Sequence, residues 1–201
     1  MIELCRAIAA GEDAQVRKAL AADPTLATRL LEVGATRGDP TDYFLNPILH
    51  YVYAGDTLLH VAGAAYRAAL VPLLVAAGAD VAAANRRGAS PLHYAADGGP
   101  GAPHWDPPAQ VRTIEALLAA GAPVDAIDAG SVTPLHRAIR CRCSAAVAAL
   151  LAGGADPKRP NAKGTRPIQL AKLTTGKSGS GEPAARAEQV EILRLLEKHG
   201  G

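Results

Sequence analysis

The chain has 201 residues, of which 49% are hydrophobic and only 3% aromatic, and its formal net charge is +2. No apolar run reaches the roughly 18 residues that a membrane-spanning helix needs. The opening residues MIELCR lack the basic and then apolar segments of a secretory signal, and three cysteines are too few for a disulfide framework. We therefore expect a cytoplasmic protein with reduced thiols and no membrane attachment.

The N-terminal quarter of the chain predicts two short helices followed by an irregular segment. Leu4 and Cys5 precede Gly11, after which Val16 and Leu20 recur at helical spacing. The segment that follows is rich in aromatic residues for this chain. Of the seven aromatic residues, four lie within it or at its edge, namely Tyr43, Phe44, Tyr51 and Tyr53.

A four-residue signature then recurs through the rest of the chain. It reads Thr57–His60, Ser90–His93, Thr133–His136 and, in a weaker copy, Arg166–Gln169. The first two copies are 33 residues apart, and so are the last two. In the clearest copies a hydroxyl residue suits the helix N-cap, and the proline after it suits the first helical position. Each copy therefore predicts the start of a short helix.

A second helix is expected in each unit, closed by a glycine. The glycines of Gly78-Ala79-Asp80, Gly121-Ala122-Pro123 and Gly154-Ala155-Asp156 suit the left-handed residue that ends a helix. Apolar residues at helical spacing predict the buried stripes of these helices. The expected stripes are Val111, Ile114, Leu117 and Leu118, then Val147, Leu150 and Leu151, and finally Val190, Ile192, Leu193, Leu195 and Leu196.

These features together resemble the ankyrin repeat, whose signature is a 33-residue period with a Thr-Pro-Leu-His core and a closing Gly-Ala-Asp. The resemblance implies an all-α fold, an ankyrin repeat solenoid of stacked helix pairs with short β-hairpin-like fingers. We expect a single ankyrin repeat domain over residues 1–201, of a bacterial type with about five repeats. Its parts are a degenerate N-terminal cap repeat at 1–24, an insertion at 25–53, and repeats at about 54–86, 87–128, 129–161 and 162–201.

Three insertions interrupt the period. The spacing from Cys5 to His60 leaves 22 extra residues, and that from His93 to His136 leaves 10, which we place at 98–108. The last unit has 12 extra residues, placed at 174–182. Insertions in repeat arrays form loops, often on a binding face. Trp105, beside His104 in the second insertion, could anchor a partner or fold the loop back onto the solenoid, and the sequence leaves both open.

The resemblance also implies where a partner binds, at the finger tips and on the exposed side of the first helix of each pair. The candidate partner-binding residues, including two from the second insertion, are Tyr53, Arg86, Arg87, Asp97, His104, Trp105, Arg140 and Lys163. Residues 133–177 hold nine Lys and Arg against Asp156 alone, a net charge of +8. We therefore expect a monomeric, non-catalytic scaffold that binds an acidic protein partner through its concave face and insertions.

Direct binding of RNA or another polyanion by the basic repeats is the alternative function. The absence of any aromatic residue in 133–177 on which a base could stack weakens it. Less favoured is a metal-binding protein or enzyme that uses the insertion around His104 and Trp105.

No catalytic residue, metal or cofactor is expected. The ligand types of His136, Cys141 and Cys143 suit zinc, but the two cysteines lie about 200° apart on one helix. Gly176-Lys177-Ser178 matches the end of a phosphate loop without the glycine that should stand five residues earlier. By the resemblance, the signature histidines are structural and tie neighbouring units together through the backbone.

Overall fold

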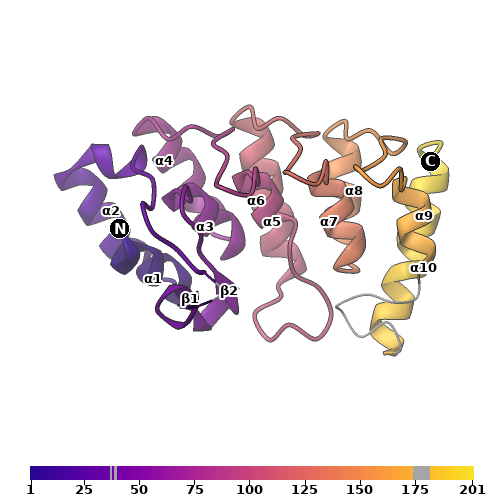
Figure 1. The fold of residues 1–201 in the computed structure, drawn as a ribbon, viewed down its shortest axis with the longest axis horizontal. Helices are drawn as coiled ribbons and strands as arrows, with labels where there is room; N and C mark the ends of the chain where they lie inside the picture. The colour runs from indigo at the N-terminus through magenta and orange to yellow at the C-terminus, as the bar shows by residue number, and fades with distance from the viewer. Residues whose placement is uncertain (37, 39, 174–181) are drawn as a thin grey trace.

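The structure is a computed structural model that describes residues 1–36, 38, 40–173 and 182–201. It is 53% helix and 2% strand, which confirms the all-α expectation. The helices form a row of pairs that runs from the N-terminus to the C-terminus (Figure 1). The first helices of the pairs are α1 (Ile2–Ala10), α3 (Leu58–Ala64), α5 (Pro91–Ala95), α7 (Pro134–Arg140) and α9 (Pro167–Lys172). The second helices are α2 (Asp13–Ala22), α4 (Val71–Ala76), α6 (Pro107–Ala119), α8 (Ser144–Ala152) and α10 (Pro183–Lys198).

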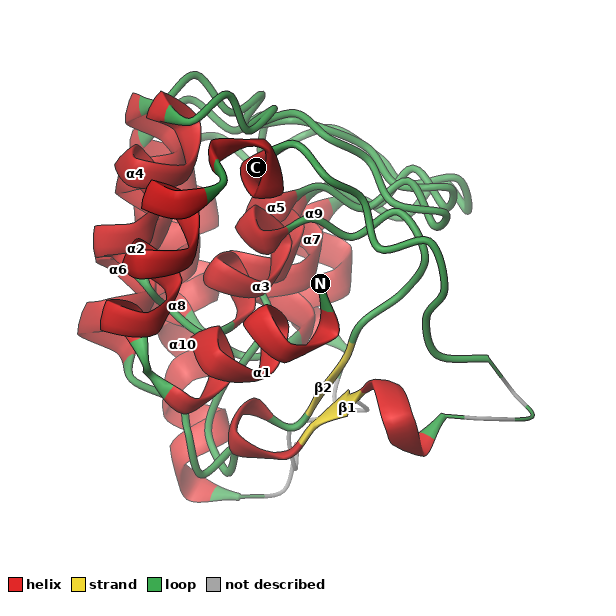
Figure 2. Ribbon diagram, turned by 90° about the vertical axis from the view of Figure 1, so that its left-hand side faces the viewer, coloured by secondary structure: helices red, strands yellow, loops and turns green. Residues whose placement is uncertain are grey.

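The pairs stack into a layered solenoid (Figure 2). In the outer layer α4 packs on α6, α6 on α8 and α8 on α10, while in the middle layer α3 packs on α5, α5 on α7 and α7 on α9. Finger loops extend from the far side of the middle layer. These loops (53–56, 85–89, 128–132 and 161–165) each precede a first helix, and we name the surface formed by the loops and these first helices the finger face.

Each signature starts a first helix through hydrogen bonds between its own residues. At α3 the backbone N–H of Thr57 donates to Nδ1 of His60 at 3.1 Å, and the backbone N–H of His60 points back to the Thr57 hydroxyl at 3.4 Å. Because Nδ1 accepts, Nε2 carries the proton, and it donates to the carbonyl of Ala89 in the next unit at 2.9 Å. One buried side chain thus caps its own helix and holds the following finger.

Three histidines repeat this arrangement along the solenoid, and we name His60, His93 and His136 the histidine ladder. Nε2 of His93 bonds the carbonyl of Val132 at 2.8 Å, and that of His136 reaches Thr165 at 3.4 Å. The structural role expected for these histidines is confirmed. Gln169, the counterpart in the last unit, is exposed, and among the described residues its side-chain oxygen accepts from the backbone N–H of Arg166 at 2.8 Å.

The first insertion folds back onto the solenoid. Short 3-10 turns at Pro24–Ala27, Thr41–Tyr43 and Asn46–Ile48 accompany an antiparallel hairpin of β1 (Phe44–Leu45) and β2 (His50–Tyr51). The strand β1 and the Asn46–Ile48 turn pack against α1. Backbone hydrogen bonds join residue 31 to residues 55 and 56, and residue 35 to residue 52. The apolar residues buried by this segment are Ala27, Leu31, Ala35, Leu45, Ile48 and Val52.

The second insertion is held by a buried glutamine near the start of α6. Nε2 of Gln110 donates to the carbonyls of Ala95 at 2.9 Å and Asp97 at 3.1 Å. Its Oε1 accepts from the indole N–H of Trp105 at 3.0 Å and from the thiol of Cys143 at 2.9 Å. Trp105 is half-buried against the core, so its side chain folds back onto the solenoid, one of the two arrangements that the sequence left open.

The buried stripes differ from the expected ones at four residues. Placing Val190 on the buried face of α10 is wrong, since its side chain is 69% exposed. The reason is helical geometry, because residues 190 and 192 lie about 200° apart around the axis. Leu193 is half-buried, and so are Val111 and Leu118, because Gln110 and Thr113 take the core side of α6.

The third insertion, placed at 174–182, lies outside the described residues except for Glu182, as does Gly176-Lys177-Ser178. Within the described part of the chain, no helix combines the length and the apolar character that crossing a membrane requires.

Candidate functional site

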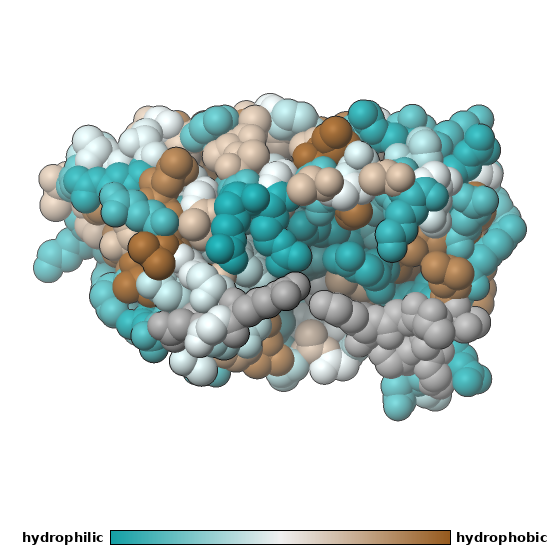
Figure 3. Space-filling view, in the orientation of Figure 1, coloured by the Kyte–Doolittle hydropathy of each residue, from teal (hydrophilic) through white to brown (hydrophobic). Residues whose placement is uncertain are grey.

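A cavity of about 580 Å³ opens on the finger face between the two insertions. One wall is the hairpin β1–β2, the other is the second insertion, and α5 and α7 contribute to the floor. Hydrophilic side chains gather at the middle of this face (Figure 3). We name the cavity the two-insertion pocket. Its polar and aromatic lining residues are His50, Tyr51, Tyr53, Asn85, Arg87, Tyr94, Asp97, His104, Asp128, Arg137, Arg140 and Cys141.

Arg137 joins two carboxylates at the floor of the pocket. Its Nη1 lies 2.9 Å from Oδ2 of Asp97, its Nη2 lies 3.3 Å from Oδ2 of Asp128, and its side chain is only 12% exposed. Burial opposes the charged form, but the two carboxylates outweigh it, so the pKa of Arg137 is raised. Its Nε is buried without a hydrogen-bond partner in the described structure. The guanidinium is therefore a fixed cation whose charge is already matched.

Asp128 is held in place from two sides. Its Oδ1 accepts the backbone N–H groups of Gly130 at 2.8 Å and Val132 at 3.0 Å, which shapes the finger turn. Burial alone would raise the pKa of this carboxyl, but the two N–H groups and Arg137 outweigh burial and lower it. Asp128 is thus an anion that is satisfied within the fold.

Two histidines from the insertions line opposite walls of the pocket. The ring of His50 meets that of Tyr94 edge-on with 4.5 Å between centroids, and His104 stacks on Tyr66 at 6.1 Å. Burial lowers the pKa of both imidazoles, so both are neutral at physiological pH. The hydroxyl of Tyr94 donates to the buried carboxylate of Asp56 at 2.9 Å, which fixes the ring that His50 contacts.

The structure brings five of the eight expected partner-binding residues together. Tyr53, Arg87, Asp97, His104 and Arg140 all line the two-insertion pocket. Asp97 and Arg140 are near neighbours, with Nη2 of Arg140 3.9 Å from Oδ1 of Asp97.

The other three expected residues lie outside the pocket lining. Arg86 donates to the carbonyl of Ala35 and lies over the ring of Tyr53, 5.3 Å from its centroid. Lys163 is exposed on the last finger, and Trp105 packs behind the pocket wall on Gln110. The ring of Tyr53 is also covered by Arg87, at 5.0 Å. Part of the surface expected to face a partner is therefore used within the fold.

Comparison with known protein families decides the identity of the fold. The model of the ankyrin repeat family matches residues 87–129 and 132–163. These ranges contain the two clearest signatures, with the histidine ladder geometry described above. The chain is an ankyrin repeat protein. Its solenoid of stacked helix pairs is the fold expected of that family. No curated protein matches the sequence. Ankyrin repeats are generally protein–protein interaction modules and are typically non-catalytic.

The basic character of this ankyrin repeat protein is weaker on its surface than in its sequence. Of the nine basic residues in 133–177, Arg137 is neutralised by Asp97 and Asp128 from other units. Arg142 is buried, and its guanidinium donates to the carbonyls of Ala171 and Leu173. Burial lowers its pKa. The residues of this segment that are exposed in the described structure are Arg140, Lys158, Arg159, Lys163, Arg166 and Lys172.

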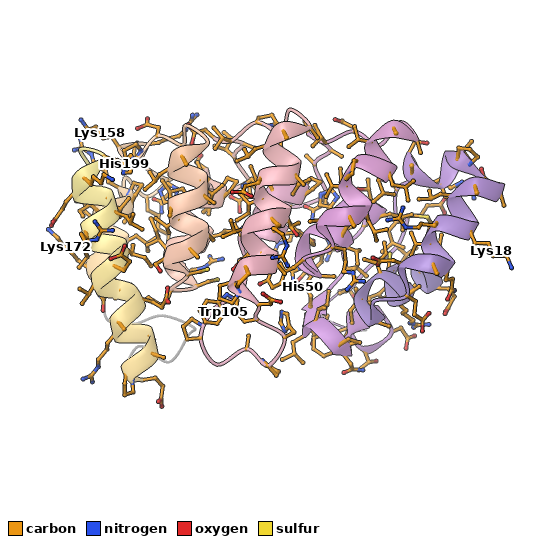
Figure 4. All side chains as sticks on the ribbon, turned by 180° about the vertical axis from the view of Figure 1, so that it is seen from behind. Lys18, His50, Trp105, Lys158, Lys172 and His199 are labelled. Atoms are coloured by element: carbon orange, nitrogen blue, oxygen red, sulfur yellow. The ribbon has the colours of Figure 1, made fainter. Side chains whose placement is uncertain are left out.

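The basic residues are also divided between two regions. Figure 4 shows Lys158 beside His199 at the C-terminal end of the solenoid, whereas His50 and Trp105 lie on the neighbouring insertions. The ammonium of Lys158 lies near Gly200, so the charge of this lysine is located at the C-terminal end of the solenoid. Arg140 on α7 and Lys163 on the last finger are two exposed cations that the basic segment contributes to the finger face.

The three residues of the possible metal constellation each contact a different group. His136 bonds the carbonyl of Thr165, and Cys143 donates to Gln110. The thiol of Cys141 lies 3.8 Å from Oδ1 of Asp97, and burial raises its pKa to about 11. Within the described ranges no group of three or more His, Cys, Asp or Glu residues is arranged to hold a metal ion.

Three residues that shape the pocket are among those that the sequence analysis did not identify as binding residues. They are His50, Tyr94 and Arg137, which come from the first insertion, α5 and α7. Arg137 follows a signature histidine directly, so its position on a first helix could be predicted from the sequence. Its two carboxylate partners could not be predicted in this way. His50 stands beside Tyr51 in an insertion, a pairing of residue types that could have marked it as a binding residue.

Proposed function

We propose that this ankyrin repeat protein is a monomeric, non-catalytic interaction module that binds an acidic protein segment along its finger face. The observation that carries the proposal is the set of exposed cations on that face. Arg87 and Lys163 form no ion pair within the described residues, and the nearest carboxylate oxygen to Arg140 is 3.9 Å away. Cations without partners attract an anionic segment and orient its approach.

A protein segment is favoured over a nucleic acid by what surrounds these cations. Three tyrosine rings line the pocket beside these cations: Tyr53 is covered by two guanidiniums, Tyr94 is buried, and Tyr51 is 38% exposed. Single-stranded nucleic acids bind through stacking on exposed aromatic side chains as well as through charge. The finger face therefore supplies charge with little surface on which bases could stack.

Selection from a random peptide-display library on the full chain tests the proposal. We expect the recovered peptides to be rich in Asp and Glu. We also expect them to bind the unmodified protein more tightly than the charge-reversed pair Arg140→Glu and Lys163→Glu. The matched control is Lys18→Glu with Arg186→Glu, which changes the net charge equally at exposed positions on α2 and α10. Recovery of basic or neutral peptides, or tighter binding of polyuridylic acid than of any peptide, would reject the proposal.

A further inference from the structure

The two-insertion pocket contains a pair of buried polar atoms that the fold leaves unsatisfied. Nε2 of His50 and Nδ1 of His104 have no hydrogen-bond partner among the described residues. Both residues line the same cavity, from its two different walls. An unpaired buried polar group costs about 1–3 kcal/mol, and native proteins tolerate few of them. Both atoms are covered in the unliganded fold, so a ligand that turns the two rings towards the cavity and bonds both nitrogens would remove this cost.

Both walls are fixed before any ligand binds. The hairpin is anchored by the buried residues Leu45, Ile48 and Val52. The second insertion is anchored at Asp97, whose carbonyl accepts from the hydroxyl of Tyr66 at 2.6 Å and from Gln110 at 3.1 Å. A preformed site avoids the ordering cost that a flexible loop incurs on binding. A volume of about 580 Å³ is also in the range of pockets that bind small ligands.

The unmatched charge of the pocket is positive. Asp97 and Asp128 share the guanidinium of Arg137, and Asp128 is also bonded to the backbone of its own finger. Arg87 has no carboxylate partner within the described residues, and Arg140, 44% exposed, has only its long contact with Asp97. An entering anion would therefore meet guanidinium groups whose charge is not yet matched.

An apolar rim lies next to these cations. Leu49, at the turn of the hairpin, is 51% exposed and is held at φ 48°, in the left-handed region that a leucine rarely adopts. Tyr51 beside it is 38% exposed. Both residues line the pocket. The rim thus suits a ligand that carries an apolar group close to its anionic one.

We propose that the two-insertion pocket binds a carboxylate group of an acidic protein segment. The carboxylate accepts hydrogen bonds from His50 and His104 and pairs with Arg140, and a neighbouring apolar side chain packs on Leu49 and Tyr51. A neutral imidazole has one N–H, which can be at either ring nitrogen. With the N–H of His50 at Nε2 and that of His104 at Nδ1, both atoms are hydrogen-bond donors. This inference rests on the proposed function. It adds that the insertions determine which acidic segments bind.

The test is a titration of the full chain with a capped octapeptide of alternating glutamate and leucine, followed by the fluorescence of Trp105, the single tryptophan. Its controls are the same peptide with glutamine, and with lysine, in place of glutamate. The protein variants are His50→Phe, His104→Phe and their combination, with His199→Phe as the matched change at the end of α10. Free glutarate is titrated separately, since it carries the same carboxylate chemistry without a peptide.

We expect the glutamate peptide to bind at least about tenfold more tightly than the glutamine peptide, and each pocket histidine variant to lose about tenfold, with His199→Phe unchanged. If the double variant does not fold, the imidazole N–H signals of the unmodified protein provide the readout. They shift with the glutamate peptide and stay in place with the glutamine peptide.

Equal binding of the glutamate and glutamine peptides, or tighter binding of the lysine peptide, overturns the inference. Tight binding of glutarate with no gain from the peptide overturns its assignment to a protein segment. Weakening by the Arg140 and Lys163 reversal without any effect of the histidine variants rejects the pocket and leaves the proposed function intact. Absence of binding by any acidic peptide rejects both.

Discussion

Protonation of the histidine ladder should make this ankyrin repeat protein unstable in mild acid, and His93 allows the effect to be calculated. His93 is fully buried, bonds Ser90 through Nδ1 and donates from Nε2 to Val132. Burial lowers the pKa of its imidazole from 6.5 to about 4. Because the pKa is lower in the folded state, the unfolded state binds more protons between these two values. The stabilisation by neutral His93 is therefore complete above pH 6.5 and is lost as the pH falls towards 4.

At one pKa unit for each 1.36 kcal/mol, this histidine alone should remove about 2 kcal/mol of the free energy of unfolding between pH 7.5 and pH 5. The comparison variant is His93→Gln, which does not titrate. Gln169 shows that glutamine at this position can still accept the N-cap hydrogen bond, at 2.8 Å from the backbone N–H of Arg166. We expect the variant to be less stable at pH 7.5 but to lose less stability on acidification.

Urea unfolding followed by circular dichroism at pH 7.5 and pH 5 measures the difference. Titration of the surface carboxylates affects both proteins and cancels between them. An equal loss in the two proteins would refute the assignment of His93 as a buried neutral donor. A smaller loss in the unmodified protein would refute it as well, since it would reverse the sign of the linkage.

Five further substitutions test the packing and the finger face. Leu117→Ala should lower the free energy of unfolding by about 2–4 kcal/mol, because it opens a cavity at a fully buried position between stacked outer helices. Lys163→Ala should leave thermal unfolding nearly unchanged. Equal effects of the two substitutions would contradict the assigned packing. Trp105→Ala should lower the free energy of unfolding by about 1–3 kcal/mol. Trp105→Phe should lower it by about 1 kcal/mol, since this change removes only the hydrogen bond to Gln110. An alanine variant as stable as the parent would show that the second insertion does not pack on the solenoid. Tyr53→Ala should speed dissociation of an acidic peptide and leave the association rate of the peptide unchanged in surface-binding kinetics, because the ring acts at short range. Slower association instead would mean that the role of Tyr53 is to position Arg86 and Arg87.

The starts of the first helices were predictable because the information is local. Ser90, Pro91 and His93 lie within four residues, and each contributes to the cap of α5 through its own chemistry. The ladder followed from the family resemblance and was confirmed. In α10 the pattern failed at Val190, where apolar character alone was taken as burial although the residue lies on the exposed side of the helix.

The pocket was only partly predictable because its contacts join distant residues. Arg137 and Asp97 are separated by 40 positions in the chain, and Tyr94 and Asp56 by 38. No periodic pattern links such pairs, so the net charge of +8 in residues 133–177 was read as surface charge, although part of it is neutralised by carboxylates of other units. The insertions lack helical periodicity, so the sequence located them without indicating that they fold back to form two walls of one cavity.

The measurement that tests the central claim most directly is the association rate of a selected acidic peptide as a function of salt. Stopped-flow mixing compares the unmodified protein with the Arg140→Glu and Lys163→Glu pair and with the Lys18→Glu and Arg186→Glu control. If the finger face attracts its partner by charge, the unmodified protein and the control associate quickly at low salt and slow as salt rises. The reversed pair should associate slowly throughout. Identical rates and salt dependence for the two double variants would show that the cations of the finger face do not guide binding.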